Sequence, residues 1–165
     1  MNRNLLIIGA GQYGMVAKEI AESMRCFDKI DFLDDNSPLA IGKVSEYADL
    51  FGKYGCAFVA IGNSNVRLGL IRGLEETGYH ASTLISPLAS VSPTARIMQG
   101  SIVEPMAVVQ AFSHVGVGCL VCAGAVIKHN AVVEDGCYID CNATVMPEAT
   151  VPFGTRVIAN SSFAL

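Results

Sequence analysis

The chain has 165 residues, of which 52% are hydrophobic and 16% are charged, a composition that excludes an intrinsically disordered protein. A net charge of -4 without any basic run argues against nucleic acid as a partner. The sequence has no signal-peptide pattern and no apolar run of the roughly 20 residues that a membrane span needs, so we expect a soluble, cytoplasmic protein with reduced cysteines.

The first half alternates strand and helix patterns. Residues 4–14 read as a buried strand running into the glycine turn GAGQYG, and a helical pattern follows. Further strands are predicted at 29–35 and 56–62, then a helix capped by Asn63 or Ser64 and ending near Gly78, and a last short strand at 81–86. This alternation predicts a Rossmann-like α/β domain over residues 1–86, with a parallel sheet covered by helices.

The glycine turn suggests a phosphate-binding function for this domain. Glycines let the main chain approach a phosphate at a helix N-terminus, and Asp34 follows Gly14 by the distance expected of a ribose-binding acid. The alternative is a tight turn that binds nothing. Because the domain has room for little more than one βαβαβ half, a mononucleotide or nucleotide-sugar fits better than NAD.

From residue 91 the sequence period changes to six. An aliphatic residue occupies every sixth position without a miss, and a small residue follows each one four positions later. The aliphatic positions are Val91, Ile97, Val103, Val109, Val115, Val121, Ile127, Val133, Ile139, Val145, Val151 and Val157. These twelve hexads predict four turns of a triangular coil over residues 91–162, whose strands pair with the next turn about 4.8 Å away. The second domain, residues 87–165, is thus a parallel β-helix, left-handed as in proteins known to carry this repeat.

The cysteine spacing of this half resembles a zinc motif, but the repeat explains part of it. Cys119 and Cys137 are 18 residues apart and occupy the small inward position, whereas Cys122 and Cys141 hold different places in their hexads. A carbonic anhydrase of the γ type has the same coil but needs three metal-binding histidines, and this coil holds two. We expect no metal.

The geometry of the coil does not require a histidine at position 129. His129 is the third residue of its hexad, outside and near a corner, and its equivalents one turn away are Ala111 and Pro147. One interpretation is an exposed surface imidazole. The other is a general base, because imidazole titrates near neutral pH and can accept a proton from an attacking amine or hydroxyl.

The order of these motifs resembles the bacterial nucleotide-sugar acetyltransferases, the PglD/NeuD-like group of UDP-4-amino-sugar N-acetyltransferases and sialic acid O-acetyltransferases. The resemblance runs from residue 4 to about 160 through IIGAGQYG, FLDD, AIGN with Arg67 downstream, LISPLASVSPTA, IVEPMAVVQA and IKHNAVV. It implies a homotrimeric enzyme that moves acetyl from acetyl-CoA to an amino or hydroxyl group of a UDP-sugar or similar nucleotide-sugar.

The resemblance also implies roles for single residues. His129 matches the general base of the family, and acetyl-CoA would lie beside it in a cleft between neighbouring β-helices. Contacts to acetyl-CoA would come from Tyr138 and Ala159. Contacts to the nucleotide-sugar would come from Gly11, Gln12, Tyr13, Asp34, Asp35 and Gly62.

Three features depart from the family pattern. The carboxylate that often follows the catalytic histidine is Asn130 here, and the second family histidine, at the acetyl-CoA site, is Tyr138. Family members usually continue for further coils, of which only Ala159 matches a later CoA-contacting position. The resemblance therefore leaves two alternatives to an active enzyme: a non-catalytic nucleotide-sugar-binding paralogue and a truncated family member. A third reading is an acetyltransferase for a small non-nucleotide acceptor.

Overall fold

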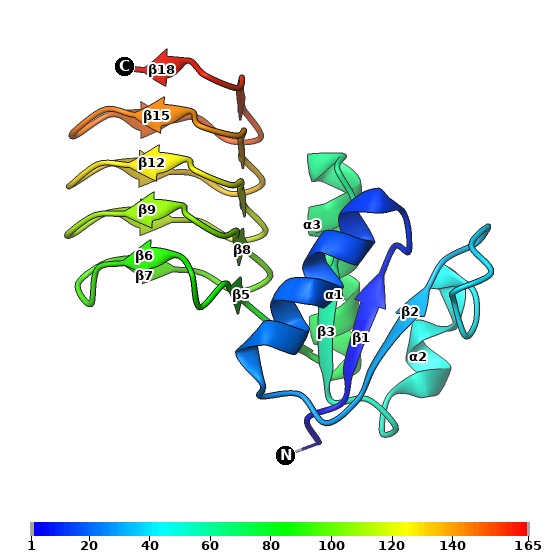
Figure 1. Ribbon diagram of the computed structural model, residues 1–165. Coiled ribbons are helices and arrows are strands. Elements are labelled where there is room, and N and C mark those ends of the chain that lie inside the picture. Colours follow the sequence, from blue (N-terminus) through cyan, green and yellow to red (C-terminus); the bar gives the residue numbers. More distant parts are fainter. Residues whose placement is uncertain (1, 165) are drawn as a thin grey trace. The chain divides into compact units, whose positions relative to one another are not determined.

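The computed structural model describes residues 2–164 and divides the chain into two compact units, Met1–Leu84 and Ile85–Leu165 (Figure 1). The first unit holds the helices and the second is a stack of short strands. Between residues 2 and 164 no helix is both long and apolar enough to cross a membrane.

The first unit is built on a four-stranded parallel sheet in the order β2-β1-β3-β4. Its strands are β1 (Leu5–Ile8), β2 (Ile30–Leu33), β3 (Cys56–Val59) and β4 (His80–Ala81). Every residue of β1 is fully buried, as expected of a central strand in a sheet covered on both faces. The predicted strands at the start of the chain, at 29–35 and at 56–62 are confirmed, with shorter bounds.

Two helices pack on this sheet. The helix α1 (Gln12–Met24) contacts β1 and β2, and α3 (Ser64–Thr77) contacts β3 and β4. As predicted, Asn63 caps α3, because its side-chain oxygen accepts the N–H of Val66 at 3.0 Å, and Gly78 ends it with φ 108°. Two short helical segments, η1 (Val44–Glu46) and α2 (Tyr47–Leu50), precede β3.

The single strand predicted at 81–86 is wrong, because the structure has two strands there that belong to different sheets. β4 ends at Ala81 and pairs with β3, whereas β5 (Leu84–Ile85) begins a sheet of the coil. The physical reason lies in the repeat: Ile85 precedes Val91 by six residues and already points to the coil core. The coil also extends further than predicted, since Phe163 pairs with Val145.

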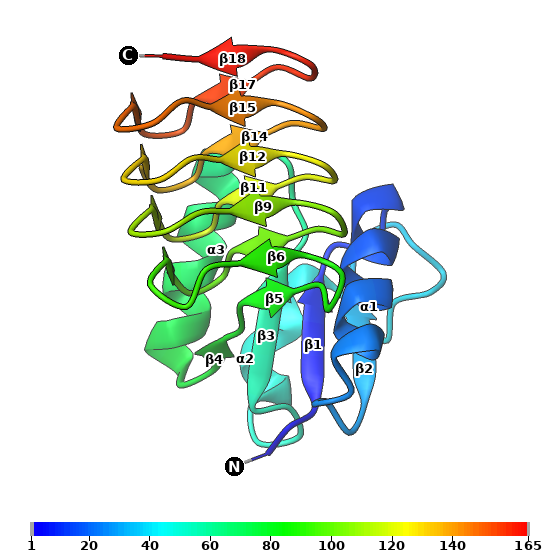
Figure 2. The same ribbon diagram turned by 60° about the vertical axis from the view of Figure 1, so that its left-hand side comes forward.

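The second unit is a left-handed parallel β-helix with three faces (Figure 2). The first face contains β5, β8, β11, β14 and β17, the second β6, β9, β12, β15 and β18, and the third β7, β10, β13 and β16. The strands after β5 are β6 (Ser90–Val91), β7 (Arg96–Ile97), β8 (Ile102–Val103), β9 (Val108–Val109), β10 (His114–Val115), β11 (Leu120–Val121), β12 (Val126–Ile127), β13 (Val132–Val133), β14 (Tyr138–Ile139), β15 (Thr144–Val145), β16 (Thr150–Val151), β17 (Arg156–Val157) and β18 (Ser162–Phe163). The predicted fold class is confirmed.

The core of the coil consists of the two inward positions that the period predicts. The aliphatic residue, hexad position one, is fully buried in residues such as Val115 and Ile139, and the small residue at position five is fully buried in Ala125 and Cys137. Cys119 stacks in the same inward column as Cys137, as predicted. Sheet pairing joins residues eighteen apart, so each side chain lies directly above its equivalent in the previous coil.

Hexad position four has a left-handed backbone at most corners of the coil. From residue 100 to residue 160 every sixth residue has φ between 56° and 70°, and eight of these eleven residues are glycine or asparagine. The remaining three are Met106, Phe112 and Glu148. Glycine has no Cβ penalty in this conformation and asparagine tolerates it best among the others, so the corner geometry explains this column.

The corner geometry predicts opposite effects for two glycine-to-alanine changes. Gly154 has φ 63°, so Gly154→Ala should lower the free energy of unfolding by about 1–2 kcal/mol. Gly69 lies exposed inside α3, and an added Cβ would meet nothing within 4 Å, so Gly69→Ala should raise it by about 0.5–1 kcal/mol. Urea unfolding followed by circular dichroism measures both, and a stabilising Gly154→Ala would contradict the corner argument.

Candidate active site

Three strands of the first unit end at one place. Ala10 follows β1 and donates its N–H to Asp34 after β2, at 2.8 Å. Gly9 has φ 103°, and a Cβ on it would lie 3.0 Å from the carbonyl oxygen of Ala60 after β3. A Cβ on Gly14 would collide with the carbonyl of Gly9, so α1 packs onto the turn only because this residue is glycine. The glycine pattern therefore has a structural basis at these two positions.

Two other glycines have no such packing role. Gly11 is the N-cap residue of α1 without a side-chain cap, and an added Cβ on Gly11 or Gly62 would meet nothing within 4 Å. Both residues are exposed and follow β1 and β3, between which the sheet order reverses direction. Ligands of open α/β sheets bind at this topological switch point, and a helix N-terminus there favours an anion. Gln12 and Tyr13 form the start of the same helix.

Asp34 connects the loops that follow β1 and β2. One carboxylate oxygen accepts the N–H of Ala10, and the other accepts those of Asn36 at 2.9 Å and Ser37 at 3.0 Å. The bond from Ala10, followed by the one from Asn36, holds the pKa of Asp34 below its ordinary value. The acid that the sequence predicts to bind a ribose thus has a structural role in the loops. Its neighbour Asp35 is exposed and accepts the N–H of Val44 at 3.0 Å.

Arg67 supports the third loop and was missed as a site-building residue. Its side chain is fully buried, and one guanidinium nitrogen donates to the carbonyls of Ile61 at 2.6 Å and Gly62 at 2.8 Å. The signal was present in the sequence, because Arg67 shares the helix face of Ile71 and Leu74 at i, i+4 and i+7. An arginine on an otherwise apolar face indicates a buried polar contact.

His129 projects from the edge of the coil between the second and third faces. The residue is exposed and follows β12, and its main-chain N–H donates to the side-chain oxygen of Gln110 at 3.2 Å. The side-chain nitrogen of Asn130 lies 3.3 Å from Nδ1 of the imidazole. Asn130 has φ 58°, so its identity fits the left-handed corner as well as the histidine contact.

An open groove of about 620 Å³ runs along the second face and reaches His129. Its walls combine hydroxyl and amide groups with small apolar side chains. The groove is lined by Ser90, Val91, Ser92, Pro93, Val108, Val109, Gln110, Ala111 and His129. His129 is therefore accessible to a bound molecule from this face.

The two residues expected to contact acetyl-CoA lie elsewhere on the coil. Tyr138 belongs to β14 on the first face, and Ala159 lies at the corner after β17, between the first and second faces. The edge that carries His129 is opposite the first face of the prism. A single chain does not bring these residues to one place.

Tyr138 takes part in a polar cluster on the first face. The guanidinium of Arg156 lies over its ring, 4.7 Å from the centroid, and pairs with Asp140 at 2.5 Å. Burial, followed by a hydrogen bond with Cys122, raises the pKa of the Tyr138 phenol. The phenol therefore remains a neutral hydrogen-bonding group at physiological pH.

Cys122, Asp140 and Cys141 offer ligand atoms within 4.8 Å of one another, although the two cysteines hold different hexad positions. Asp140 is already paired with Arg156, and burial raises the pKa of the Cys122 thiol, which disfavours the thiolate that a metal needs. The cluster gives no support for a metal centre.

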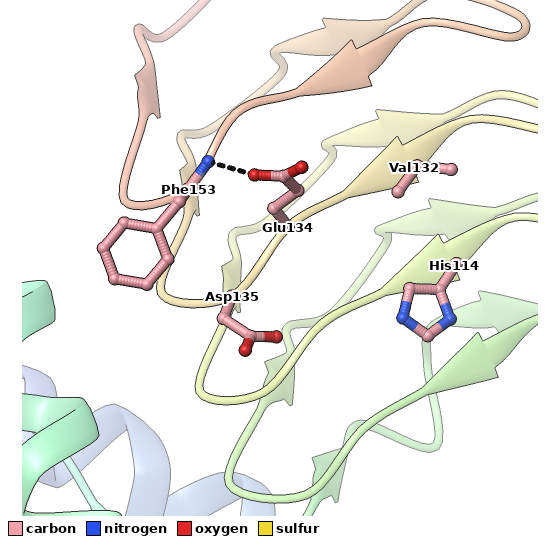
Figure 3. Close-up of a pocket in the computed structure, with 5 residues that line it drawn as sticks. All are labelled: His114, Val132, Glu134, Asp135 and Phe153. Carbon is pink, nitrogen blue, oxygen red and sulfur yellow. Dashed lines mark hydrogen bonds between the residues drawn. The ribbon is translucent and has the colours of Figure 1, made fainter.

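A second hollow, of about 270 Å³, lies on the third face (Figure 3). It is lined by His114, Val132, Glu134, Asp135 and Phe153. Both acids hold corners of the coil: Glu134 accepts the N–H of Phe153 at 2.7 Å, and Asp135 accepts that of Val117 at 2.7 Å. These contacts give the carboxylates a structural role.

Comparison with known proteins gives matches over nearly the whole chain. Residues 4–74 match the family described as the PglD N-terminal domain. The acetyltransferase domain of PglB from Neisseria gonorrhoeae, solved in complex with acetyl coenzyme A, is 30% identical with a TM-score of 0.83, over 98% of this chain and 85% of that one. The same domain solved separately gives a TM-score of 0.90 at 29% identity, over 99% and 92%. PerB from Caulobacter crescentus, in complex with CoA and GDP-perosamine, has the same fold, with a TM-score of 0.75 at 21% identity over 98% and 91%.

The fold and these comparisons define a hexapeptide-repeat acyltransferase with an added α/β unit. The identity to the gonococcal domain extends through both units, so the relationship covers more than the coil. The chain belongs to the PglD/NeuD-like family of nucleotide-sugar acetyltransferases.

The contacts of Asp34 predict a pH-dependent contribution to stability. Its pKa is lower in the folded chain than the value of about 3.9 in an unfolded chain, so its contribution is present above that value and is lost as pH falls through the folded pKa. Asp34→Asn should lower the free energy of unfolding by about 1–3 kcal/mol at pH 7, and the difference from wild type should shrink towards pH 3. Urea unfolding at both pH values tests this.

Asp35→Asn is the matched control for this measurement. Asp35 accepts a single main-chain N–H and is exposed, so the change should lower the free energy of unfolding by less than about 1 kcal/mol. Equal losses for the two variants would remove the special role of Asp34.

Proposed function

We propose that this protein transfers the acetyl group of acetyl-CoA to an amino group, or a hydroxyl group, of a nucleotide-linked sugar, with His129 as the general base. The amine nitrogen attacks the thioester carbonyl, the new C–N bond forms, and the C–S bond to CoA breaks. Nε2 of His129 takes the amine proton, and the thiolate of CoA leaves and is protonated in turn. The observation that carries this proposal is an exposed imidazole at a groove of the coil, in a chain that is 30% identical to an acetyltransferase domain solved with acetyl coenzyme A.

Asn130 is proposed to orient the imidazole. For Nε2 to act as the base in a neutral ring, Nδ1 must carry the hydrogen and donate it to an acceptor. The side-chain nitrogen of Asn130 lies 3.3 Å from Nδ1 of the imidazole. Turning the carboxamide by 180° puts its oxygen at that position, where it accepts the Nδ1 hydrogen. An amide orients the ring in this way but stabilises the imidazolium less than a carboxylate would.

Acetyl-CoA binding is proposed to need a second copy of the chain. Tyr138 and Ala159 are the proposed acetyl-CoA contacts, and they lie on the side of the coil opposite the edge of His129. A cyclic trimer of parallel coils would bring the first face of one copy to the His129 edge of its neighbour, so each cleft would hold one complete site.

The first unit is proposed to hold the nucleotide. Gly11 and Gly62 border open space at the strand ends, with Gln12 and Tyr13 at the start of α1. The diphosphate of a UDP-sugar would lie at this helix N-terminus, and Asp34 and Asp35 would be near its ribose and base. The unit has a single sheet of four strands, which suits a mononucleotide better than NAD.

Ligand binding separates this function from its alternatives. UDP and acetyl-CoA should each raise the melting temperature when added alone, and NAD should give a smaller shift than UDP. Thermal shift measurements with each ligand over a concentration series give the result. Stabilisation by UDP without any by acetyl-CoA would indicate a non-catalytic nucleotide-sugar-binding protein, and the reverse would indicate a non-nucleotide acceptor.

The catalytic assignment predicts the behaviour of two variants. His129→Ala should lower kcat by about 10²–10⁴-fold, the usual contribution of a positioned base. Its free energy of unfolding should change by less than about 0.5 kcal/mol, because Ala111 occupies the same column one coil below. Asn130→Asp keeps a residue that tolerates the left-handed corner and should raise kcat at pH 8.5, because a carboxylate at Nδ1 strengthens the base more than an amide does.

The assay for both variants is CoA release with a panel of UDP-amino sugars. Wild type and His129→Ala proceeding at equal rates would overturn the role of His129. An inactive wild type restored by Asn130→Asp would instead indicate a binding protein descended from an enzyme.

Assembly is a separate expectation. We expect a homotrimer, because between residues 91 and 162 the coil carries few charges on its faces, and broad apolar faces of this kind pack against something. Light scattering coupled to gel filtration at micromolar concentration should give three times the mass of the 17.4 kDa chain. A monomeric mass at that concentration would remove the proposed acetyl-CoA cleft.

A further inference from the structure

Three corners of the coil are held by the same side-chain contact. In each, a side-chain oxygen at hexad position two accepts the main-chain N–H of position three in the coil above, nineteen residues later. The three pairs are Glu104 with Ala123 at 3.0 Å, Gln110 with His129 at 3.2 Å, and Glu134 with Phe153 at 2.7 Å. Figure 3 shows the contact between Glu134 and Phe153.

This contact serves an N–H that the ladder between coils does not require. Prolines, which have no N–H, occupy hexad position three at Pro87, Pro93, Pro105 and Pro147. Where the residue is not proline, a side-chain acceptor can satisfy the group, and it then ties the corner to the coil below. The corner of His129 is therefore held in two places, through its main-chain N–H by Gln110 and through Nδ1 by Asn130.

The acceptor at the histidine corner differs in charge from the other two. Glu104 and Glu134 are carboxylates, whereas Gln110 is a neutral amide of nearly the same length as glutamate. A carboxylate at Nδ1 would orient the ring as well as add charge, whereas a carboxylate at the main-chain N–H of His129 would add only its charge. That charge favours imidazolium at lower pH, and imidazolium cannot accept a proton. The charged residues on the adjoining coil segments are Lys128, which precedes His129, and Glu148, whose N–H donates to the His129 carbonyl at 3.2 Å.

We propose that Gln110 is a positioning residue for His129: its side-chain oxygen fixes the corner from which the imidazole projects, and it does so without adding a negative charge. The inference rests on the proposed role of His129 as the base. Gln110 acts through the main chain of His129 and needs no contact with the reacting atoms.

Two variants of Gln110 separate the contact from its charge. Gln110→Ala removes the acceptor, so the His129 amide should exchange with solvent at least about tenfold faster, and kcat should fall about 10- to 100-fold with KM for acetyl-CoA within about twofold. Gln110→Glu keeps the acceptor, so amide protection should remain. Its kcat should be near wild type at pH 8.5 and fall at pH 6.5, because the added charge keeps the ring protonated to higher pH.

Glu134→Ala is the matched control. It removes the same contact from a corner without a histidine, so the Phe153 amide should lose protection while kcat stays at the wild-type value. Amide exchange by NMR on the full chain, with kcat and KM at both pH values, covers all variants. A fall in kcat for Glu134→Ala as large as for Gln110→Ala would show a general effect of loosening the coil and would overturn the proposal.

Two further outcomes also overturn the proposal. One is a His129 amide whose exchange is unchanged by Gln110→Ala. The other is an active enzyme in which that amide is released but kcat stays at the wild-type value. If the wild type shows no acetyl transfer, the proposed function fails independently of the positioning role. The order of the His129 ring, measured by NMR relaxation, then tests that role. Greater ring disorder in Gln110→Ala supports the positioning role, and unchanged order overturns it.

Discussion

The parallel hydrogen-bond ladder between coils is the constraint on which the second unit depends. It places every residue directly above the residue eighteen positions earlier, so equivalent residues form columns along the coil. The same type of residue is therefore required at each place in a column. Position one must be aliphatic, position five small, and position four able to adopt a left-handed backbone. Position three is less constrained than these, because its side chain points outward and proline is accepted there. Chemistry can enter the coil at this position without disturbing its core, and His129 occupies it.

In the first unit, contacts of polar side chains fix the loops at the strand ends. In the second unit, the hydrogen-bond ladder between coils fixes the backbone. Asp34 connects the loops after β1 and β2, and the buried guanidinium of Arg67 fixes the loop after β3 through two carbonyls. These two contacts leave Gly11 and Gly62 at the mouth of the switch point with no side chain to fill the space. A rigid turn with open space before it suits the main-chain recognition of a phosphate.

Much of this architecture is predictable from the sequence because periodicity reports burial directly. The hexads predict the coil, the inward-facing cysteines and the outward-facing position of His129. The glycine turn predicts the first strand and helix. Other features depend on contacts across the fold. The strand at 81–86 divides in two because Ile85 follows the hexad period that begins one repeat earlier than expected. The contact of Gln110 joins residues nineteen apart, and the buried Arg67 is visible only once α3 is placed on its sheet.

The columns also make the coil a molecular ruler. The column that carries the imidazole reads Pro93, Ala111, His129 and Pro147, spaced by about 4.8 Å along the axis. Gaining or losing one complete turn before His129 would move the imidazole along the axis by the spacing of one coil. The imidazole would stay on the same edge, and the geometry above and below it would not change. Gaining or losing a single hexad would instead rotate it to another edge. Evolution can thus adjust the reach of such a base in discrete steps, and only multiples of eighteen residues preserve its direction.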